Sequence, residues 1–366
     1  MKIVVFGLAI SSSWGNGHAT LWRGLCKHLV RLGHRVTFYE HDVPYYAATR
    51  DLFELPGGRL ELFSTWDEVR PRARSDLHDA DAAIVTSYCP DAREATELML
   101  DKGGAIRVFY DLDTPVTLAR LRNNEAVPYI PPNGLGNFDL VLSFTGGRLV
   151  ADEFCRLAGA RQVQPLYGHV DPDIHRPTAP QPHYRADLSY LGTYSEDRQQ
   201  LLQRLFVEPA RTRRDLRFLI GGAQYPQDFP WSPNIFFVQH LPPSEHAAFF
   251  SSSHLTLNVT RSEMARMGWC PSGRLFEAAA CGTPLLSDSW DGLDTFFTPG
   301  EEIILAHEAA DTLAAMDMSD DVLSRIAGRA RERTLAQHSS ARRASELVDL
   351  LEHAVRAEPR LAAEEA

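Results

Sequence analysis

The stretch PSGRLFEAAACGTPLLSD, from Pro271 to Asp288, shows the boundaries of its secondary structure most clearly. Ser272 is a typical residue to precede a helix, and Gly282 ends the apolar helical pattern that follows it. The apolar residues after Gly282 have the length of a buried strand. A short helix that leads directly into a buried strand predicts an α/β fold, in which helices and strands alternate.

The same alternation extends over the rest of the second half of the chain. Short apolar segments separated by helical patterns predict strands there. These segments are 188–191, 217–220, 235–238, 255–258 and 284–287. Beyond residue 311 the pattern becomes helical to about residue 356, and the alanine- and glutamate-rich end is expected to fray.

The first half of the chain opens with a strand–helix–strand unit. Lys2–Leu8 and Arg35–Glu40 are strand-like, and Thr20–Leu32 has a helical spacing of apolar residues that ends at Gly33. Further short apolar segments follow at 82–86, 105–110 and 140–144. Together these elements predict a doubly wound parallel sheet in the first half of the chain.

A proline-rich stretch without periodicity, QPLYGHVDPDIHRPTAPQP at 164–182, separates the two halves and is typical of an interdomain linker. A length of 366 residues also exceeds the roughly 250 to 300 at which a single hydrophobic core stops growing. We therefore predict two Rossmann-like α/β domains, at 1–168 and 169–345. Residues 346–366 are predicted to be the end of the C-terminal helix and a frayed tail.

The composition excludes several classes of function. A net charge of −11 and a pI near 5.7 argue against a nucleic-acid-binding protein, which needs a basic surface. Five cysteines without a CxxC pair predict reduced thiols and a cytoplasmic location, and they give no zinc signature. No apolar stretch approaches the roughly 20 residues that span a bilayer, so any membrane contact is expected to be peripheral.

The helix that follows Ser272 is predicted to bind a diphosphate. Free N–H groups in the first turn of a helix and the helix dipole favour an anion, and the guanidinium of Arg274 adds a charge. Lysine occurs only at positions 2, 27 and 102, so arginine and backbone groups must supply phosphate contacts in the second half. One turn further along, Glu277 offers a carboxylate to two ribose hydroxyls; alternatively, it is an ordinary polar helix residue.

The segment FEAAACGTPLL, which begins at Phe276, resembles the nucleotide-sugar motif of GT-B glycosyltransferases. The longer segment NVTRSEMARMGWCPSGRLFEAAACGTPLLSDSWDGLDTFFTPGEEI, at 258–303, resembles the C-terminal domain of the CgeB-like family. This resemblance implies two Rossmann-like domains that face each other across a cleft, with the nucleotide-sugar held by the second domain. It implies that Glu277 contacts the ribose and that the diphosphate lies near Ser272, Gly273 and Arg274. Trp269 stands where many retaining members have an acidic residue, so no stereochemical outcome or particular sugar is implied.

Further donor-side residues are predicted in loops that follow strands. In SYLGTYSEDR, at 189–198, Gly192 permits close backbone approach, and Arg198 is expected to reach the diphosphate. A solvated helix arginine is the alternative for Arg198. The segments FLIGGAQ, with Gly222, and FVQHLP, with His240, resemble the loops that surround the base in this fold.

Candidate acceptor-side residues come from the first domain. His18 follows the loop SSSWGNG at the start of a predicted helix, where one inverting group of GT-B enzymes carries its general base; alternatively, it bonds backbone or water. The loop is not a dinucleotide fingerprint, because Thr20 stands where the third glycine is needed. Asp111 and Asp113 follow a strand, at the sheet edge where ligands gather, and are predicted to act as base or to bind acceptor hydroxyls. Asp113 could equally cap a turn.

The predicted function is transfer of a glycosyl group from a nucleoside-diphosphate sugar, with UDP implied by the resemblance. The sequence leaves the acceptor open among a glycan, a lipid-linked compound and a small molecule. No cofactor and no essential metal are expected, because GT-B enzymes generally bind the diphosphate without an ion. Two alternatives stand beside this prediction: a sugar-nucleotide epimerase or hydrolase with the same fold, and a protein that binds a nucleotide-sugar without turning it over.

Overall fold

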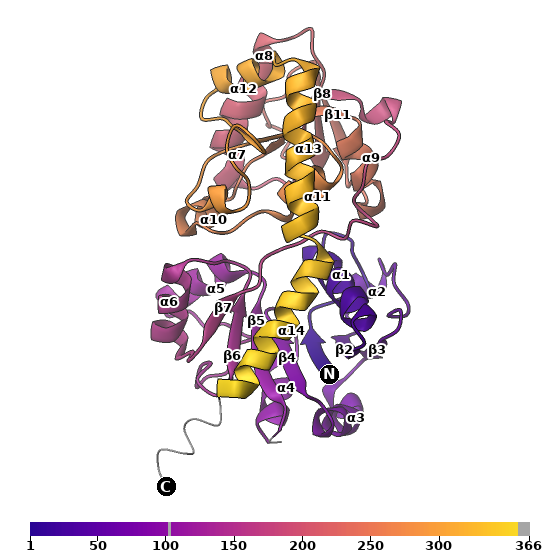
Figure 1. Cartoon of the computed structure of the whole chain (residues 1–366), viewed down its shortest axis with the longest axis vertical. Coiled ribbons are helices and arrows are strands. Elements are labelled where there is room, and N and C mark those ends of the chain that lie inside the picture. Colours follow the sequence, from indigo (N-terminus) through magenta and orange to yellow (C-terminus); the bar gives the residue numbers. More distant parts are fainter. Residues whose placement is uncertain (102–103, 358–366) are drawn as a thin grey trace. The chain divides into compact units, whose positions relative to one another are not determined.

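The computed structural model describes residues 1–101 and 104–357. They form two compact units (Figure 1). Unit 1 comprises Met1–Tyr167 together with the chain from residue 340 onward, and unit 2 comprises Gly168–Ser339. Each unit has its own parallel sheet and its own hydrophobic core, which confirms the prediction of two Rossmann-like α/β domains.

The seven strands of the sheet in unit 1 are parallel and follow the order β3-β2-β1-β4-β5-β6-β7. The strands are β1 (Lys2–Gly7), β2 (Arg35–His41), β3 (Arg59–Phe63), β4 (Ala82–Thr86), β5 (Ile106–Asp111), β6 (Leu140–Ser143) and β7 (Val163–Pro165). The helices are α1 (Gly17–Arg31), α2 (Pro44–Ala47), α3 (Trp66–His78), α4 (Ala92–Leu100), α5 (Thr114–Arg122), α6 (Arg148–Ala158) and α14 (Ser340–Ala357).

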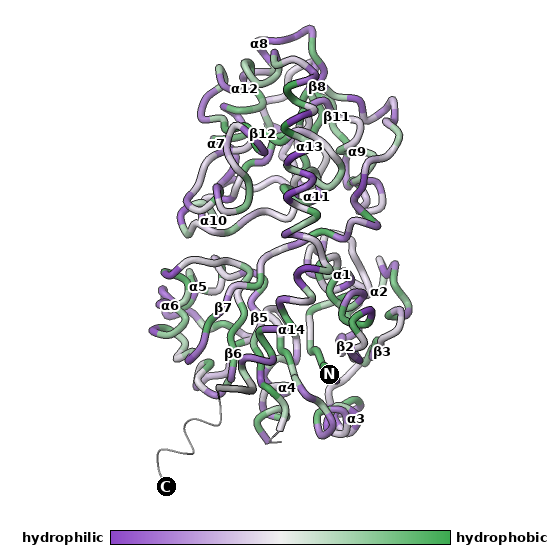
Figure 2. Tube along the Cα trace, in the orientation of Figure 1, coloured by the Kyte–Doolittle hydropathy of each residue, from purple (hydrophilic) through white to green (hydrophobic). Residues whose placement is uncertain are grey.

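The core of unit 1 includes the last helix of the chain. Buried Trp22 and Leu25 of α1 belong to the same apolar cluster as Leu347 and Leu351 of α14, and the two helices pack together. Apolar residues recur every three or four positions along α14, so one face of this helix is buried. Hydrophilic and hydrophobic residues alternate along α14 in Figure 2.

The borders of the units differ from the ranges that the sequence indicated. The first segment of unit 1 ends at Tyr167 rather than at residue 168, and unit 2 ends at Ser339 rather than at residue 345. Residues 340–345 belong to unit 1 because they begin α14, whose apolar face docks on α1. The part of the expected frayed tail at 358–366 lies outside the described residues.

The six strands of the sheet in unit 2 are parallel and follow the order β10-β9-β8-β11-β12-β13. The strands are β8 (Ala186–Leu191), β9 (Phe218–Gly222), β10 (Ile235–Gln239), β11 (Ser253–Asn258), β12 (Leu285–Ser287) and β13 (Ile304–Leu305). The helices are α7 (Glu196–Leu202), a π-helical turn (Gln203–Val207), α8 (Glu208–Thr212), α9 (His246–Ser251), α10 (Ser262–Met267), α11 (Gly273–Ala280), α12 (Ala309–Met316) and α13 (Asp320–Gln337). None of the described helices is long and apolar enough to cross a membrane.

The strands that the sequence did not predict are those at or near a sheet edge. β3 and β13 are edge strands, and β7 closes the other edge of the first sheet. β3 is only partly buried, while β7 and β13 have three and two residues. In the sequence of β3, RLELF, charged and apolar residues alternate, and β7 and β13 are too short to form a distinct apolar run. The remaining edge strand, β10, was predicted because its sequence opens with the continuous apolar run IFFV. The first two residues of the expected linker at 164–182 belong to β7.

Each sheet has a switch point, a pair of neighbouring strands from which the chain continues in opposite directions across the sheet. In unit 1 this point lies between β1 and β4, and in unit 2 it lies between β8 and β11. The loops that leave two such neighbouring strands diverge to opposite faces of the sheet, which opens a crevice at their carboxyl ends. In open α/β sheets this is the position where ligands bind, so these loops are the first places to look for a site.

Candidate functional site

Three of the predicted donor-side residues meet at the carboxyl ends of neighbouring strands in unit 2. The backbone nitrogen of Gly192 donates to the carbonyl of Gly221 at 2.9 Å, and that of His240 donates to the carbonyl of Gly222 at 2.7 Å. A Cβ atom at Gly222 would lie 2.0 Å from the carbonyl oxygen of Gly192. The close approach of these two backbones therefore requires glycine at 222.

The start of α11 is built as the sequence predicts. Ser272 has an extended conformation, and its side chain accepts a hydrogen bond from the backbone nitrogen of Arg274 at 3.3 Å. No acidic residue lies in the first turn of α11, so nothing in that turn offsets the positive end of the helix dipole. This helix end can accept an anion such as a diphosphate.

Arg198 and Arg274 come from the two sides of the switch point in unit 2. Arg198 lies on α7, which follows β8, and Arg274 lies on α11, which follows β11. Burial raises the pKa of Tyr190 on β8, and the charges of both arginines oppose this rise. Both guanidinium groups therefore lie near the hydroxyl of Tyr190. The buried Nε atoms of both arginines have no hydrogen-bond partner in the part of the chain that the structure describes. Such unsatisfied donors are suited to an anionic ligand.

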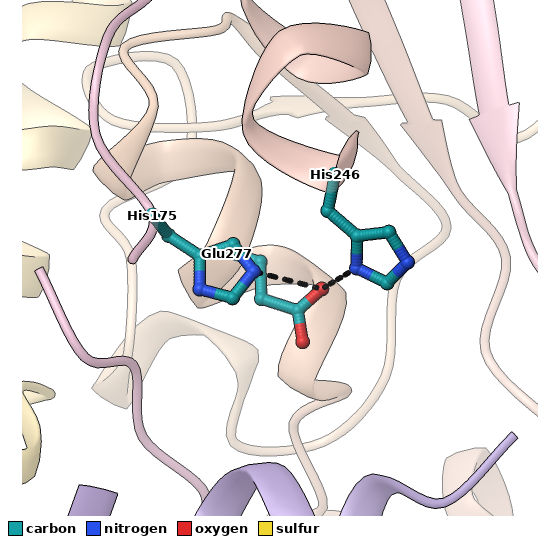
Figure 3. Close-up of side chains that lie close together, drawn as sticks. All are labelled: His175, His246 and Glu277. Carbon is teal, nitrogen blue, oxygen red and sulfur yellow. Dashed lines mark ion pairs between the residues drawn. The ribbon is translucent and has the colours of Figure 1, made fainter. Parts of the chain in front are cut away.

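Glu277 lies within α11 and is 9% exposed. Its carboxylate faces two imidazoles (Figure 3): Oε2 is 3.5 Å from Nδ1 of His246 and 4.0 Å from Nε2 of His175. These separations exceed those of well-formed N–H···O hydrogen bonds. A Cβ atom at Gly273 would lie 3.7 Å from Oε1, so the second oxygen is directed toward the first turn of the helix.

The electrostatic environment keeps Glu277 ionised. Burial by itself would raise the pKa of this carboxyl, but Arg274, His246 and His175 more than offset burial and lower the pKa below its ordinary value. Burial also lowers the pKa of His175, although the nearby Glu277 opposes this. His175 is therefore a neutral imidazole at pH 7, with one N–H donor and one acceptor nitrogen.

The trio of His175, His246 and Glu277 has the composition of a metal site. Two histidines and a carboxylate are typical zinc ligands, and the three ligand atoms lie within 4.8 Å of one another. Ligand atoms in a tetrahedral site with Zn–N distances of about 2.0 Å lie about 3.3 Å apart, so the trio is wider than an assembled site. Metal-bound histidines also usually donate their second ring N–H to a partner, whereas Nδ1 of His175 has none among the described residues.

Sequence reasoning did not find His175 or His246. His175 lies in the proline-rich stretch that we interpreted as a linker, and His246 is the first residue of the short helix α9. Neither belongs to a motif with Glu277, and the spacing along the chain carries no signal of their proximity. Packing of α9 against α11 in the folded unit brings them together.

In unit 1 the candidate residues His18, Asp111 and Asp113 lie at or after the carboxyl ends of strands near the switch point. The side chain of Asn16 caps α1 by accepting from the backbone nitrogens of His18 at 3.1 Å and Ala19 at 3.4 Å. Buried Glu40 accepts from the backbone nitrogens of Ile10 and Ser11 at 2.7 and 2.9 Å. These bonds hold the loop between β1 and α1, and thereby the position of His18.

His18 is neutral at pH 7, because burial lowers its pKa to about 4. Its Nδ1 has no hydrogen-bond partner among the residues that the structure describes. A neutral imidazole can accept a proton, which is the property that a general base needs. The ring of Tyr88, which follows β4, packs edge to face against His18.

Asp111 is the last residue of β5 and is fully buried. Burial raises the pKa of its carboxyl to about 7. Its Oδ1 accepts from the backbone nitrogen of Asp113 at 3.0 Å, whereas Oδ2 has no partner in residues 1–101 and 104–357. Asp113 occupies the N-cap position of α5, so both carboxylates start from the same strand end. A carboxyl with a pKa near neutrality is suited to proton transfer at physiological pH.

Residues 198–349 match a family model described as glycosyl transferase-like. No curated protein sequence matches the chain. Sucrose-phosphate synthase from Thermosynechococcus elongatus is similar in structure, with 13% identity and a TM-score of 0.68, over 98% of this chain and 100% of that one. Anabaena HepE in complex with UDP and glucose shares 14% identity and a TM-score of 0.65, over 96% and 100% of the two chains.

An α-glucosyltransferase in complex with UDP-glucose and DNA containing an abasic site shares 15% identity and a TM-score of 0.71, over 96% of this chain and 99% of that one. At this level of identity the likeness concerns the fold. It extends over both units of the chain, each with its parallel sheet. The chain therefore has the fold of GT-B glycosyltransferases, with a glycosyl transferase-like sequence over residues 198–349.

Proposed function

We propose that this protein transfers a glycosyl group from a UDP-sugar to a hydroxyl of an acceptor. One observation carries the proposal: Arg198, Arg274, the start of α11 and Glu277 all lie around the switch point of the sheet in unit 2. Together they offer unsatisfied cationic donors for a diphosphate and a carboxylate for a ribose. The resemblance of residues 258–303 to the CgeB-like family supports a place in that group.

In this proposal each part of the donor has its own contacts. The diphosphate lies at the first turn of α11, near Ser272 and Gly273, between the charges of Arg198 and Arg274. Glu277 accepts hydrogen bonds from the ribose hydroxyls, and the uracil lies near Gly222 and His240. Uridine is chosen because similar solved structures are described as complexes with UDP or UDP-glucose. No metal is required, because the arginines and the helix end supply the positive charge.

His18, Asp111 and Asp113 are proposed to serve the acceptor. A base among them removes the proton of the acceptor hydroxyl, whose oxygen bonds to the anomeric carbon of the sugar. The bond from that carbon to the β-phosphate oxygen breaks, and its electron pair leaves with UDP. The net charge of −11 argues that the acceptor is not a nucleic acid but a glycan, a lipid-linked compound or a small molecule.

Calorimetric titration with UDP tests the donor site. Glu277→Ala is expected to raise the Kd for UDP about 10- to 150-fold, because hydrogen bonds to a charged acceptor contribute about 1.5 to 3 kcal/mol. Glu332→Ala, an exposed glutamate on α13, is the matched control and should leave the Kd unchanged. Unchanged affinity in folded Glu277→Ala would remove this residue from the site.

Incubation with UDP-glucose alone, followed by addition of candidate acceptors, tests turnover. A glycosyltransferase produces at most slow hydrolysis with the donor alone, and UDP is released once the acceptor is present. Formation of a second sugar nucleotide would identify an epimerase, and rapid hydrolysis without acceptor would identify a hydrolase. Tight donor binding without any product across the acceptor panel would favour a binding protein, and absence of binding to any nucleotide would overturn the donor site itself.

A further inference from the structure

The two oxygens of the Glu277 carboxylate lie in different surroundings. Oε2 is directed toward His175 and His246 (Figure 3). Oε1 lies on the side of Gly273, at the start of α11. We propose that His175 and His246 are positioning residues, which hold Oε2 so that Oε1 is presented to the ribose hydroxyls of the donor. This inference rests on the proposed function.

Burial makes such support necessary. Glu277 and His175 are 9% and 3% exposed, so neither is solvated as it would be in water. An ionised carboxylate inside a protein requires nearby donors or cations to offset its lost hydration. In the described part of the chain, the two imidazoles are the basic groups that lie within 4.0 Å of Oε2.

Each histidine can donate one N–H to Oε2. The facing atoms are Nε2 of His175 and Nδ1 of His246, and both ring nitrogens of His175 lack a partner in the part of the chain that the structure describes. At 3.5 and 4.0 Å the two contacts are longer than well-formed hydrogen bonds, so in this proposal the imidazoles move closer to Oε2 when the donor binds. Two donors on one oxygen would fix the plane of the carboxylate, and thereby the direction of the remaining lone pairs on Oε1.

The arrangement joins three segments that are distant in the chain. His175 comes from the irregular stretch before β8, His246 is the first residue of α9, and Glu277 lies in the middle of α11. Any shift of α9 relative to α11 would move the donors away from Oε2. The ribose specificity of the donor site is therefore linked to the packing of these helices.

Titration of UDP and of 2′,3′-dideoxyuridine diphosphate separates positioning from general support of the fold. The wild type is expected to bind UDP more tightly, because only UDP has the two ribose hydroxyls. His175→Ala and His246→Ala should each weaken UDP binding about 3- to 10-fold, which corresponds to the loss of one hydrogen bond, and should scarcely change binding of the dideoxy compound. His307→Ala, an exposed histidine of the same unit, is the control.

Conservative variants provide the rescue test. The side-chain nitrogen of glutamine can replace Nε2 of histidine, and that of asparagine can replace Nδ1. His175→Gln and His246→Asn are therefore expected to retain most of the preference for UDP that the alanine variants lose. In a Glu277→Gln background the histidine substitutions should have little further effect, because the carboxylate through which they act is gone.

Three results would overturn the proposal. Equal weakening of both nucleotides in the alanine variants would indicate a role in the fold, and a full additive effect in the Glu277→Gln background would indicate direct contact with another part of the donor. Stoichiometric zinc in the wild type, with loss of UDP affinity on its removal, would make the trio a metal site.

Failure of the wild type to bind UDP would instead refute the proposed function, so the two failures are distinguishable. If an alanine variant does not fold, the conservative variants still decide the matter through their UDP preference.

Discussion

The imidazole of His18 and the ring of Tyr88 meet edge to face, with their centroids 6.0 Å apart. His18 follows β1 and Tyr88 follows β4, the two neighbouring strands at the switch point of the first sheet. Tyr88 has a φ of 61°, a left-handed conformation that costs free energy for a residue other than glycine. Such strain at a strand end is a feature of functional loops, and it directs attention to this strand end of unit 1.

The first prediction concerns the acceptor base. At least one of His18→Ala, Asp111→Ala and Asp113→Ala should lower kcat about 10²- to 10⁴-fold while the Kd for UDP hardly changes, because the base acts on the acceptor. His78→Ala, an exposed histidine of unit 1, is the control. Steady-state kinetics with the true acceptor, together with donor titrations, measure both quantities. Near-normal turnover in all three variants would favour a retaining reaction, which needs no base from the enzyme.

The second prediction concerns pH and activity. Burial raises the pKa of Asp111 to about 7, and only the ionised carboxylate can accept a proton. If Asp111 is the base, kcat/KM should rise as the pH increases through about 7 and should level off above it. Asp111→Asn should abolish this limb of the profile along with most of the activity. A flat wild-type profile between pH 6 and about 8 would exclude Asp111 from this role.

The titration of the Asp111 carboxyl also predicts that the stability of the protein depends on pH. Because its pKa in the folded state lies above the ordinary 3.8, the folded protein binds more protons than the unfolded chain between these values. The free energy of unfolding therefore falls as the pH rises from about 4 through about 7. Asp111→Asn should be more stable than the wild type at pH 8, by on the order of a few kcal/mol, and should have lost this advantage at pH 4. Denaturant unfolding at both pH values measures the difference, which would be the same at both if Asp111 did not titrate in this range.

The third prediction concerns the diphosphate. Arg198→Ala and Arg274→Ala should each weaken UDP binding about 10- to 100-fold, because charge-assisted hydrogen bonds to the phosphates are lost. Binding of uridine, which has no phosphate, should hardly change. Arg325→Ala, an exposed arginine on α13, is the matched control. Equal losses for UDP and uridine would show that the arginines support the structure of the site rather than the phosphates.

The fourth prediction concerns metal ions. Turnover should persist after dialysis against EDTA, because the two arginines and the start of α11 can offset the charge of the diphosphate. The measurement is UDP release with and without added magnesium or manganese. Loss of activity on chelation and its recovery with either ion would contradict this expectation.

Much of the fold was predictable from short windows of sequence. The cap at Ser272, the central strands and the start of the chain all agree with the structure, because capping and apolar periodicity are properties of neighbouring residues. The placement of His18 at the start of a helix and of Asp111 at the end of a strand followed from the same local patterns. The strands β3, β7 and β13 were not predicted, because charged and apolar residues alternate in β3 and the other two have only three and two residues.

Local sequence was thus sufficient for the α/β class, for the central strands, for α1 and α11, and for Glu277 as a candidate ribose ligand. Packing decided the rest. The docking of α14 on α1 and the approach of His175 and His246 to Glu277 depend on which segments become neighbours after the strands have assembled. Such contacts join positions far apart in the chain, and their free energy comes from burial and charge in the folded unit, so no short window of sequence records them.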